Sequence, residues 1–135
     1  MNYWLIKSEP STYSWNDLAA TKSDIWSGVR NYAARLNLRA MQKGDLCLFY
    51  HSGDESAVVG IAKVVKAAYP DPTATEGDWS AVDVAAVKKL KNPVPLKEIK
   101  KDTSLADMAL VRISRLSVSP VTEFQYHKIL AMANS

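Results

Sequence analysis

Apolar residues along the chain are grouped in short runs that have the length and composition of β-strands. Branched and aromatic side chains dominate these runs, and turn-forming residues such as Gly, Pro, Asn, Asp and Ser separate them. The predicted strands cover residues 3–7, 46–51, 57–69, 79–87 and 110–118. Gly60 interrupts the third run and is typical of a β-bulge. The pattern therefore predicts a sheet built from short strands.

Two helices are predicted from the residues that begin them. Ser14 is followed by Asp17 and Thr122 by Gln125, and both pairs have the spacing of a capping box. The first pair precedes a short helix over residues 15–20, and the second begins the closing helix of the chain. The expected apolar face of the closing helix consists of Phe124, Ile129, Leu130 and Met132. Shorter helical turns are expected at 96–101 and 104–109.

Residues 31–41 have the period of a further helix. Tyr32, Leu36 and Ala40 fall on one face, and we expect that face to be buried. Arg35 falls on another face, which is polar. This helix follows a segment, 24–29, that we interpret as a loop.

Strands joined mostly by short turns, with helices at the periphery, predict an α+β fold. The architecture expected is a small, mainly antiparallel β-barrel with peripheral helices. The 135 residues, of which 47% are hydrophobic and 23% charged, fit a single domain over residues 1–135 with enough chain to bury a core.

Composition excludes several classes of protein. Cys47 is the single cysteine, and His51 and His127 are the only histidines, so no internal disulfide, no metal and no cofactor are expected. No stretch approaches the ~18–20 apolar residues of a membrane span, and the first residues lack the features of a signal peptide. We therefore expect no membrane partner and a cytoplasmic location, with nucleoid or nuclear association as the alternative. A monomer is also expected.

The net charge of +3 admits nucleic acid as a partner but is too small for a protein that binds it by charge alone. Much of the positive charge lies in one segment that contains Lys88, Lys89, Lys91, Lys97, Lys100 and Lys101. We interpret this segment as a solvated, flexible edge around a turn at 92–95, and a phosphate-contacting strip is the alternative.

Four segments are polar and aromatic where a purely structural connector would consist of Gly, Asp and Pro. They cover residues 7–10, 26–32, 50–52 and 115–121. Three of them lie at the end of a predicted strand or in the loop before a helix, where a barrel has its ligand-binding mouth. We therefore expect these segments to form a binding site.

Taken together, these segments resemble the EVE domain family, a branch of the PUA-like superfamily that also contains the YTH and ASCH domains. The resemblance runs nearly end to end. Its main motifs are Trp4-Leu5-Ile6-Lys7-Ser8-Glu9-Pro10, Trp26-Ser27-Gly28-Val29-Arg30-Asn31-Tyr32, Tyr50-His51-Ser52, Tyr69-Pro70-Asp71-Pro72-Thr73-Ala74 and Arg115-Leu116-Ser117-Val118. Ala33 and Leu36 depart from the family, which usually has a polar residue and Asn at these positions.

The resemblance implies a closed, distorted PUA-like barrel with a pocket for a modified nucleobase in DNA or RNA, and modified cytosines are the ligands most often associated with the family. Trp26 is the expected stacking wall, beside Gly28 and Val29, and a core position is its alternative. Asn31 can present a donor and an acceptor to a base edge or cap the following helix. The hydroxyls of Ser8 and Ser52 can act as donor or as acceptor toward a base edge.

Several further residues are expected around this pocket. Arg30 and Arg35 can make bidentate contacts to phosphate and Lys7 can act as a point charge, with ion pairs to Glu9 or Asp24 as the alternative for the arginines. Tyr50 and His51 end an apolar strand and are expected at the mouth, and a buried, hydrogen-bonded His51 is equally compatible with the sequence. Ser117 and Val118 would form the pocket floor through backbone groups.

A binding module without catalysis is the function we expect, with a modified DNA or RNA base as the partner. The sequence indicates no Ser-His-Asp or Cys-His arrangement and no phosphate-binding Gly-rich loop. The alternative is an ASCH-like hydrolase of a modified nucleoside that uses Lys7 and Glu9. A protein-interaction module based on the lysine segment is a third class, for which the sequence has no motif.

Overall fold

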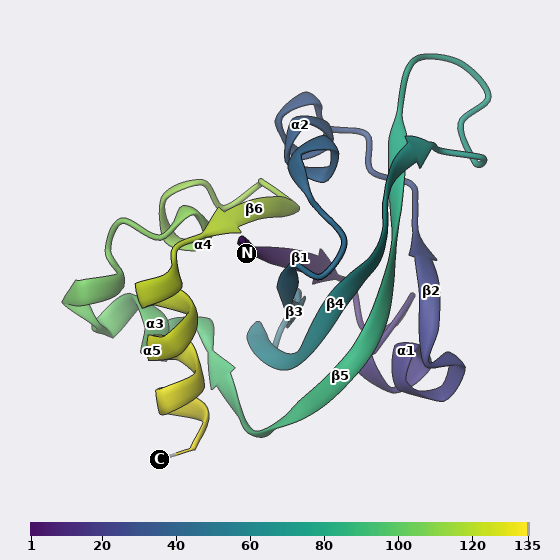
Figure 1. Ribbon diagram of the computed structural model, residues 1–135. Coiled ribbons are helices and arrows are strands. Elements are labelled where there is room, and N and C mark those ends of the chain that lie inside the picture. The colour runs from purple at the N-terminus through teal and green to yellow at the C-terminus, as the bar shows by residue number, and fades with distance from the viewer. Residues whose placement is uncertain (135) are drawn as a thin grey trace.

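The computed structural model describes residues 1–134, and within them six strands form one curled sheet (Figure 1). The strand order is β2-β5-β4-β3-β1-β6. The strands are β1 (Tyr3–Ser8), β2 (Ser23–Trp26), β3 (Leu46–His51), β4 (Ala57–Pro70), β5 (Ser80–Pro95) and β6 (Val118–Val121). The β1–β3 pair is parallel and the other pairs are antiparallel. The predicted α+β class and mainly antiparallel sheet are confirmed.

Helices cover both faces of this sheet. They are α1 (Trp15–Thr21), α2 (Tyr32–Ala40), α3 (Leu96–Lys101), α4 (Ala109–Arg112) and α5 (Glu123–Ala133), with a 3₁₀ turn at Thr103–Leu105. Capping boxes at Ser14 and Thr122 begin α1 and α5 as predicted. No helix within residues 1–134 has the length and apolar character needed to span a membrane.

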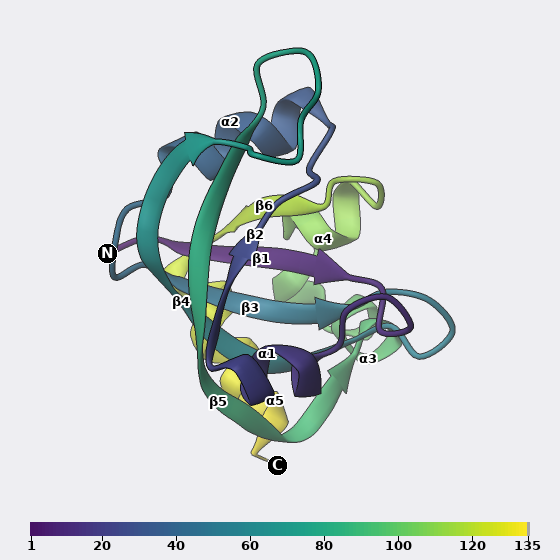
Figure 2. The same ribbon diagram turned by 90° about the vertical axis from the view of Figure 1, so that its right-hand side faces the viewer.

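The sheet curls strongly but does not close, which corrects the expectation of a closed barrel (Figure 2). β2 and β6 are its two edges, and they do not pair with each other. Each pairs with its single neighbour over four positions only. Trp26 and Val29, next to one edge, share a buried cluster with Leu116 and Val118 from the other side. Side chains therefore bridge the gap that backbone hydrogen bonds would close in a barrel.

Two hydrophobic cores explain why β1 and β3 are nearly continuous apolar runs. We call the core under α1 and α2 the inner core and the core under α3, α4 and α5 the second core. In β1, Trp4 and Ile6 belong to the inner core, whereas Leu5 belongs to the second core. In β3, Phe49 and Leu48 are divided in the same way. Successive side chains of a strand point to opposite faces, so a strand covered on both faces has no polar alternation.

Gly60 lies at an irregularity in the pairing of β4, as predicted. Phe49 pairs with Gly60, but the next residue, Tyr50, pairs with Val58, so one residue of β4 is extra. A Cβ on Gly60 would lie 2.5 Å from Cε3 of Trp15. The absent side chain therefore makes room for the indole that begins α1.

The buried face of α2 differs from the prediction. Tyr32 and Leu36 are 68% and 61% exposed, whereas Ala34 and Leu38 are fully buried. With Met41 they form a stripe of spacing four and then three, which packs on the inner core. Two apolar stripes run along this helix, and the stripe that faces the sheet is the one with the smaller side chains.

The prediction of a strand over residues 110–118 was wrong. Residues 109–112 form α4, and the strand begins only at Val118. Leu105, Met108 and Leu110 are buried in the second core, so burial of this turn outweighs the β-propensity of the segment. The segment 24–29, expected as a loop, begins instead with the last residues of β2.

The lysine segment contains no turn at 92–95, because β5 continues to Pro95. β2 pairs with β5 only as far as Ala85. Exposed lysines such as Lys88, Lys89 and Lys91 therefore lie along a part of β5 that β2 does not cover. Lysines on such a strand edge oppose pairing with another chain.

Candidate functional site

A cavity of about 540 Å³ opens beside the gap between the two edges of the sheet. One wall comes from β2 and the loop after it, and the other comes from the end of β1 and from Ser117. Seven of the predicted site residues line it: Lys7, Ser8, Trp26, Gly28, Val29, Arg30 and Ser117. Glu9 and Ser27, which belong to the predicted segments, also line it, and four residues outside those segments complete the lining: Thr12, Tyr13, Asp24 and Ile25.

Trp26 is both a core residue and part of the cavity wall. It is 9% exposed and belongs to the inner core. Its ring meets the rings of Tyr13 and Phe49 edge to face, at centroid distances of 6.2 and 5.5 Å. Neighbouring aromatic rings therefore hold the indole in place, and its remaining exposed surface borders the cavity.

Tyr13 and Asp24 form a hydrogen-bonded pair in the wall. The hydroxyl of Tyr13 donates to Oδ2 of Asp24 at 2.8 Å, and the backbone N–H of Ile25 donates to Oδ1 at 2.8 Å. Burial, together with the hydrogen bond to Asp24, raises the pKa of Tyr13 to about 12. The phenol therefore stays protonated at neutral pH, and each Asp24 oxygen retains acceptor capacity for a further donor.

The loop after β2 is held by Asp71, whose side chain is fully buried. Its Oδ2 accepts hydrogen bonds from Gly28 N at 2.8 Å and from Nη1 of Arg30 at 3.0 Å. Its Oδ1 accepts from Thr73 N and from the Thr73 hydroxyl, at 2.8 and 2.7 Å. Burial alone would raise the pKa of Asp71, but these donors outweigh it and hold the pKa at about 2.

The Gly28 backbone requires a glycine. Its φ of +80° lies in the left-handed region, and nothing lies within 4 Å of the position that a Cβ would occupy. Arg30 pairs with Asp71 rather than with Glu9 or Asp24, the partners considered from the sequence. The conformation of this wall therefore depends on Asp71, which lies on the connection between β4 and β5.

Lys7 and Ser8, at the end of β1, direct polar groups toward neighbouring backbone. Nζ of Lys7 donates to the carbonyl of Ser114 at 2.7 Å, and burial lowers the pKa of Lys7. The hydroxyl of Ser8 donates to the carbonyl of Tyr13. Ser117 contributes its carbonyl, which accepts from Lys7 N at 2.9 Å. These bonds fix the wall opposite Asp24.

Glu9 lies just beyond β1, which ends at Ser8. Its carboxylate is exposed and accepts a hydrogen bond from the hydroxyl of Ser11 at 3.2 Å. Lys7 donates instead to Ser114, so the two residues of the hydrolase alternative have different partners.

The other predicted site residues lie outside this cavity. Asn31 caps α2, because its Oδ1 accepts from Ala34 N at 2.9 Å. Tyr50 and Val118 are buried, in the second and the inner core respectively. Arg35 lies on α2 and donates through Nη1 to the carbonyl of Asp78 at 2.8 Å.

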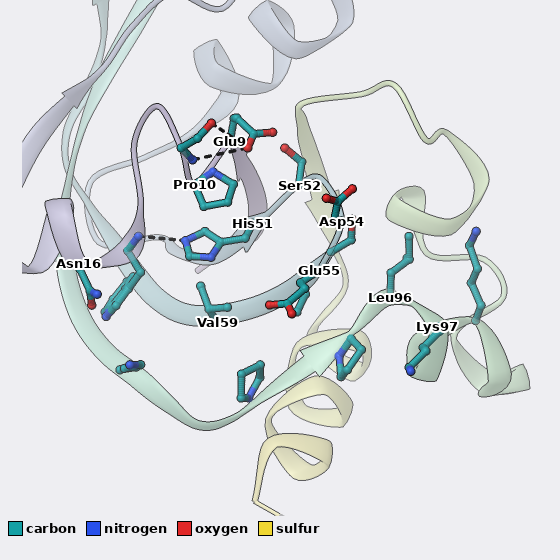
Figure 3. A pocket seen from close by; sticks show the side chains of 18 residues that line it. Glu9, Pro10, Asn16, His51, Ser52, Asp54, Glu55, Val59, Leu96 and Lys97 are labelled. Carbon is teal, nitrogen blue, oxygen red and sulfur yellow. Dashed lines mark hydrogen bonds between the residues drawn. The ribbon is translucent and has the colours of Figure 1, made fainter.

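His51 and Ser52 line a second, larger hollow of about 950 Å³ (Figure 3). It lies between the turn after β1, the β3–β4 hairpin and the start of α3. Nε2 of His51 accepts a hydrogen bond from Trp15 N at 3.0 Å, so the imidazole satisfies the first N–H of α1. Burial lowers the pKa of His51, and the charge of Glu9 opposes this shift. His51 is thus hydrogen-bonded through an unprotonated Nε2, and its side chain is half-buried.

Asp45 and Cys47 are two further buried groups that can ionise. Asp45 accepts from Nε1 of Trp4 at 3.0 Å and ties β1 to the turn before β3. Burial raises the pKa of the Cys47 thiol. Within residues 1–134, no three His, Cys, Asp or Glu side chains are grouped so that they could hold a metal ion.

The fold has a distant likeness in a YTH domain, that of the Zygosaccharomyces rouxii MRB1 protein in complex with N6-methyladenosine RNA. The TM-score is 0.62 at 19% identity, over 99% of this chain and 85% of the other. This likeness shows the fold alone, and it places the curled sheet among the PUA-like folds.

Nearer relatives cover nearly the whole chain. Mouse thymocyte nuclear protein 1 is 39% identical, over 97% of this chain and 73% of its own length. A crystal structure of an Agrobacterium tumefaciens protein has a TM-score of 0.95 at 46% identity, over 98% of this chain and 93% of that one. Human THYN1 protein in complex with 5-methylcytosine-containing DNA has a TM-score of 0.92 at 34% identity, over 100% and 99% of the two chains.

The family comparison covers the same span. The family model of the EVE domain matches residues 2–132, which include both walls of the 540 Å³ cavity. With this match and with relatives of 39% and 46% identity over almost its whole length, the chain belongs to the EVE domain family.

Proposed function

We propose that this protein is a non-catalytic reader that binds a modified nucleobase, a modified cytosine in DNA first of all, in the 540 Å³ cavity. The observation that carries the proposal is the structure of human THYN1 with 5-methylcytosine-containing DNA, which matches this chain over its whole length. The cavity volume lies within the range of about 300–1,000 Å³ typical of small-ligand sites. It is large enough for a base that has been turned out of the helix.

Asp24 is the group that would recognise cytosine. A carboxylate accepts hydrogen bonds, and the exocyclic amine of cytosine is the donor that distinguishes it from thymine. Tyr13 and Ile25 already orient the two carboxylate oxygens, so little side-chain entropy would be lost on binding. Trp26 and Val29 supply the apolar surface next to it, which suits a methyl group on the ring.

Fluorescence anisotropy with short DNA duplexes tests this proposal. The wild-type protein is expected to bind a duplex with one 5-methylcytosine more tightly than the unmodified duplex. Asp24→Asn is expected to lower this affinity about 10- to 100-fold, because an amide places a donor where the base amine requires an acceptor. Asp107→Asn is the matched control, since Asp107 is exposed and does not line the cavity.

Two results would count against the proposal. Equal affinity for modified and unmodified duplexes would show that the protein does not recognise the modification. Release of a free base or an altered nucleoside, lost in Lys7→Ala or Glu9→Ala, would make the protein an enzyme. We further infer that one chain binds one base, and light scattering coupled to gel filtration measures whether the complex contains a single copy.

A further inference from the structure

A group of aromatic and arginine side chains lies at the beginning of α2 and on the connection from β4 to β5, with Tyr32 exposed and Arg35 and Trp79 half-buried. We call Tyr32, Arg35 and Trp79 the Tyr32 cluster. Figures 1 and 2 show α2 beside this connection at one end of the curled sheet. No role in the cavity accounts for these three side chains, because none of them lines it.

The rings of the cluster are stacked. The centroids of Tyr32 and Trp79 are 5.3 Å apart, with an angle of 26° between the ring planes. The guanidinium carbon of Arg35 lies 4.9 Å from the Tyr32 centroid and 5.3 Å from the Trp79 ring. Despite these contacts, Tyr32 is 68% exposed. A large aromatic surface therefore stays open to a partner.

Several contacts hold the cluster in place. Gly77 has a φ of +86°, and a Cβ there would lie 2.7 Å from Nε1 of Trp79, so the indole lies directly against the connection. Arg35 Nη1 donates to the carbonyl of Asp78 at 2.8 Å. Arg39 pairs with the Asp78 carboxylate at 2.8 Å. A platform that is already ordered loses little entropy when a ligand binds.

The charges around the cluster leave one cation unpaired. Arg30 pairs with Asp71, and Arg39 pairs with Asp78. Arg35 makes no ion pair with any residue that the structure describes. A guanidinium that has no carboxylate partner and lies beside an exposed ring matches the two parts of a nucleotide, its phosphate and its base.

The cluster is continuous with the cavity. Arg30 lines the cavity, and its guanidinium carbon lies 5.6 Å from the Trp79 ring. We propose that the Tyr32 cluster is a second nucleotide subsite, in which Tyr32 stacks on a base neighbouring the one in the cavity and Arg35 contacts the backbone phosphate. This inference rests on the proposed function, because it assigns the polymer that flanks the bound base. Aromatic stacking is tolerant of sequence, so the subsite would add affinity without reading the neighbouring base.

Two ligands separate the subsite from the cavity. The free nucleoside 5-methyl-2′-deoxycytidine reaches only the cavity, whereas a single-stranded hexanucleotide with one 5-methylcytosine reaches both. Tyr32→Ala is expected to weaken hexanucleotide binding about 5- to 140-fold, the equivalent of about 1–3 kcal/mol of base stacking, and to leave nucleoside binding unchanged. NMR titration measures the nucleoside, and fluorescence anisotropy measures the hexanucleotide.

Matched variants sharpen the test. Tyr32→Phe keeps the ring and should bind the hexanucleotide like the wild type. Phe124→Ala removes an aromatic residue that is 58% exposed on α5, and it should change neither affinity. Arg35→Gln should lower hexanucleotide affinity and reduce the dependence of log K on log salt by about one unit of slope.

The outcomes distinguish this inference from the function on which it rests. If the wild type binds nucleoside and hexanucleotide, and Tyr32→Ala binds both equally well, the second subsite is refuted and the cavity proposal stands. If the wild type binds neither ligand, both proposals are refuted. If Tyr32→Ala weakens both ligands to the same extent, Tyr32 acts through the cavity, and the second subsite is again refuted.

Discussion

Asp71 offers the sharpest test of how the site is held together. Asp71→Asn keeps the size of the side chain but removes its charge and turns one of its two oxygens into an amide donor. Both oxygens accept from donors, Gly28 and Arg30 on one and Thr73 on the other. Whichever way the amide is oriented, two donors therefore face each other.

The cost of Asp71→Asn follows from the pKa of the carboxyl. Folding lowers this pKa from its ordinary value of 3.8 to about 2. At about 1.36 kcal/mol per pKa unit, the charged form stabilises the folded state by about 2 kcal/mol. Breaking a fully buried ion pair costs about 3–5 kcal/mol, but the Arg30 side chain is 37% exposed and water can solvate it. We therefore expect Asp71→Asn to lower the free energy of unfolding by about 2 kcal/mol.

The pH dependence has a definite sign. A carboxyl whose pKa is depressed by folding contributes its full stabilisation above the unfolded pKa, near pH 4, and loses it as the pH falls toward 2. At pH 3 about half of the contribution should remain. The difference between wild type and Asp71→Asn should therefore shrink from about 2 kcal/mol at pH 7 to about 1 kcal/mol at pH 3.

Urea unfolding at pH 7, 5, 4 and 3, followed by tryptophan fluorescence, measures these differences. Asp78→Asn is the matched control, because Asp78 also pairs with an arginine but its side chain is 82% exposed. It should cost less than about 1 kcal/mol. A loss for Asp71→Asn no larger than that of the control, or one that stays constant from pH 7 to pH 3, would refute the reasoning.

Three further changes test the packing and the caps. Gly60→Ala should lower the melting temperature and cost at least about 1–3 kcal/mol in urea unfolding, because its Cβ would lie 2.5 Å from the buried Trp15 ring. The lowered pKa of His51 means that the unfolded chain takes up the proton first, so stability should fall as the pH drops below about 6.5. His51→Phe should abolish this slope between pH 7 and pH 5, whereas His127→Gln should retain it. Thr122→Ala removes the N-cap of α5 and should cost about 0.5–2 kcal/mol, measured in the same way.

Elements with local signals were predictable from the sequence. The capping residues Ser14 and Thr122 interact with backbone three positions away. The spacing of residues in the sequence is therefore enough to identify these hydrogen bonds. The buried face of α2 has no such local signal. Its stripe through Tyr32 and Leu36 and its stripe through Ala34 and Leu38 have the same period, and only packing against the sheet selects one of them.

The residues around the cavity also include some that the sequence predicts and some that it does not. Gly28 and Arg30 were predictable because they belong to one contiguous motif that also lines the cavity. Asp71 holds that motif from 41 and 43 positions away in the chain, a separation that no spacing rule covers. Asp24 was missed because β2 is four residues long, and its pairing with β5, rather than its own composition, makes it a strand.

The unpaired edges of β2 and β6 explain two things: why the prediction of a closed barrel was wrong, and where the cavity lies. β2 and β6 pair with their neighbours over four positions each and then end, so their outer edges never meet. Asp24 and Trp26 on β2 and Lys7 on β1 line the cavity beside this opening. In a closed barrel the two edge strands would pair with each other, and their backbones would fill that space. The open edge therefore provides the recess, and the buried carboxylate of Asp71 holds in place the loop that continues from β2 and forms part of its wall.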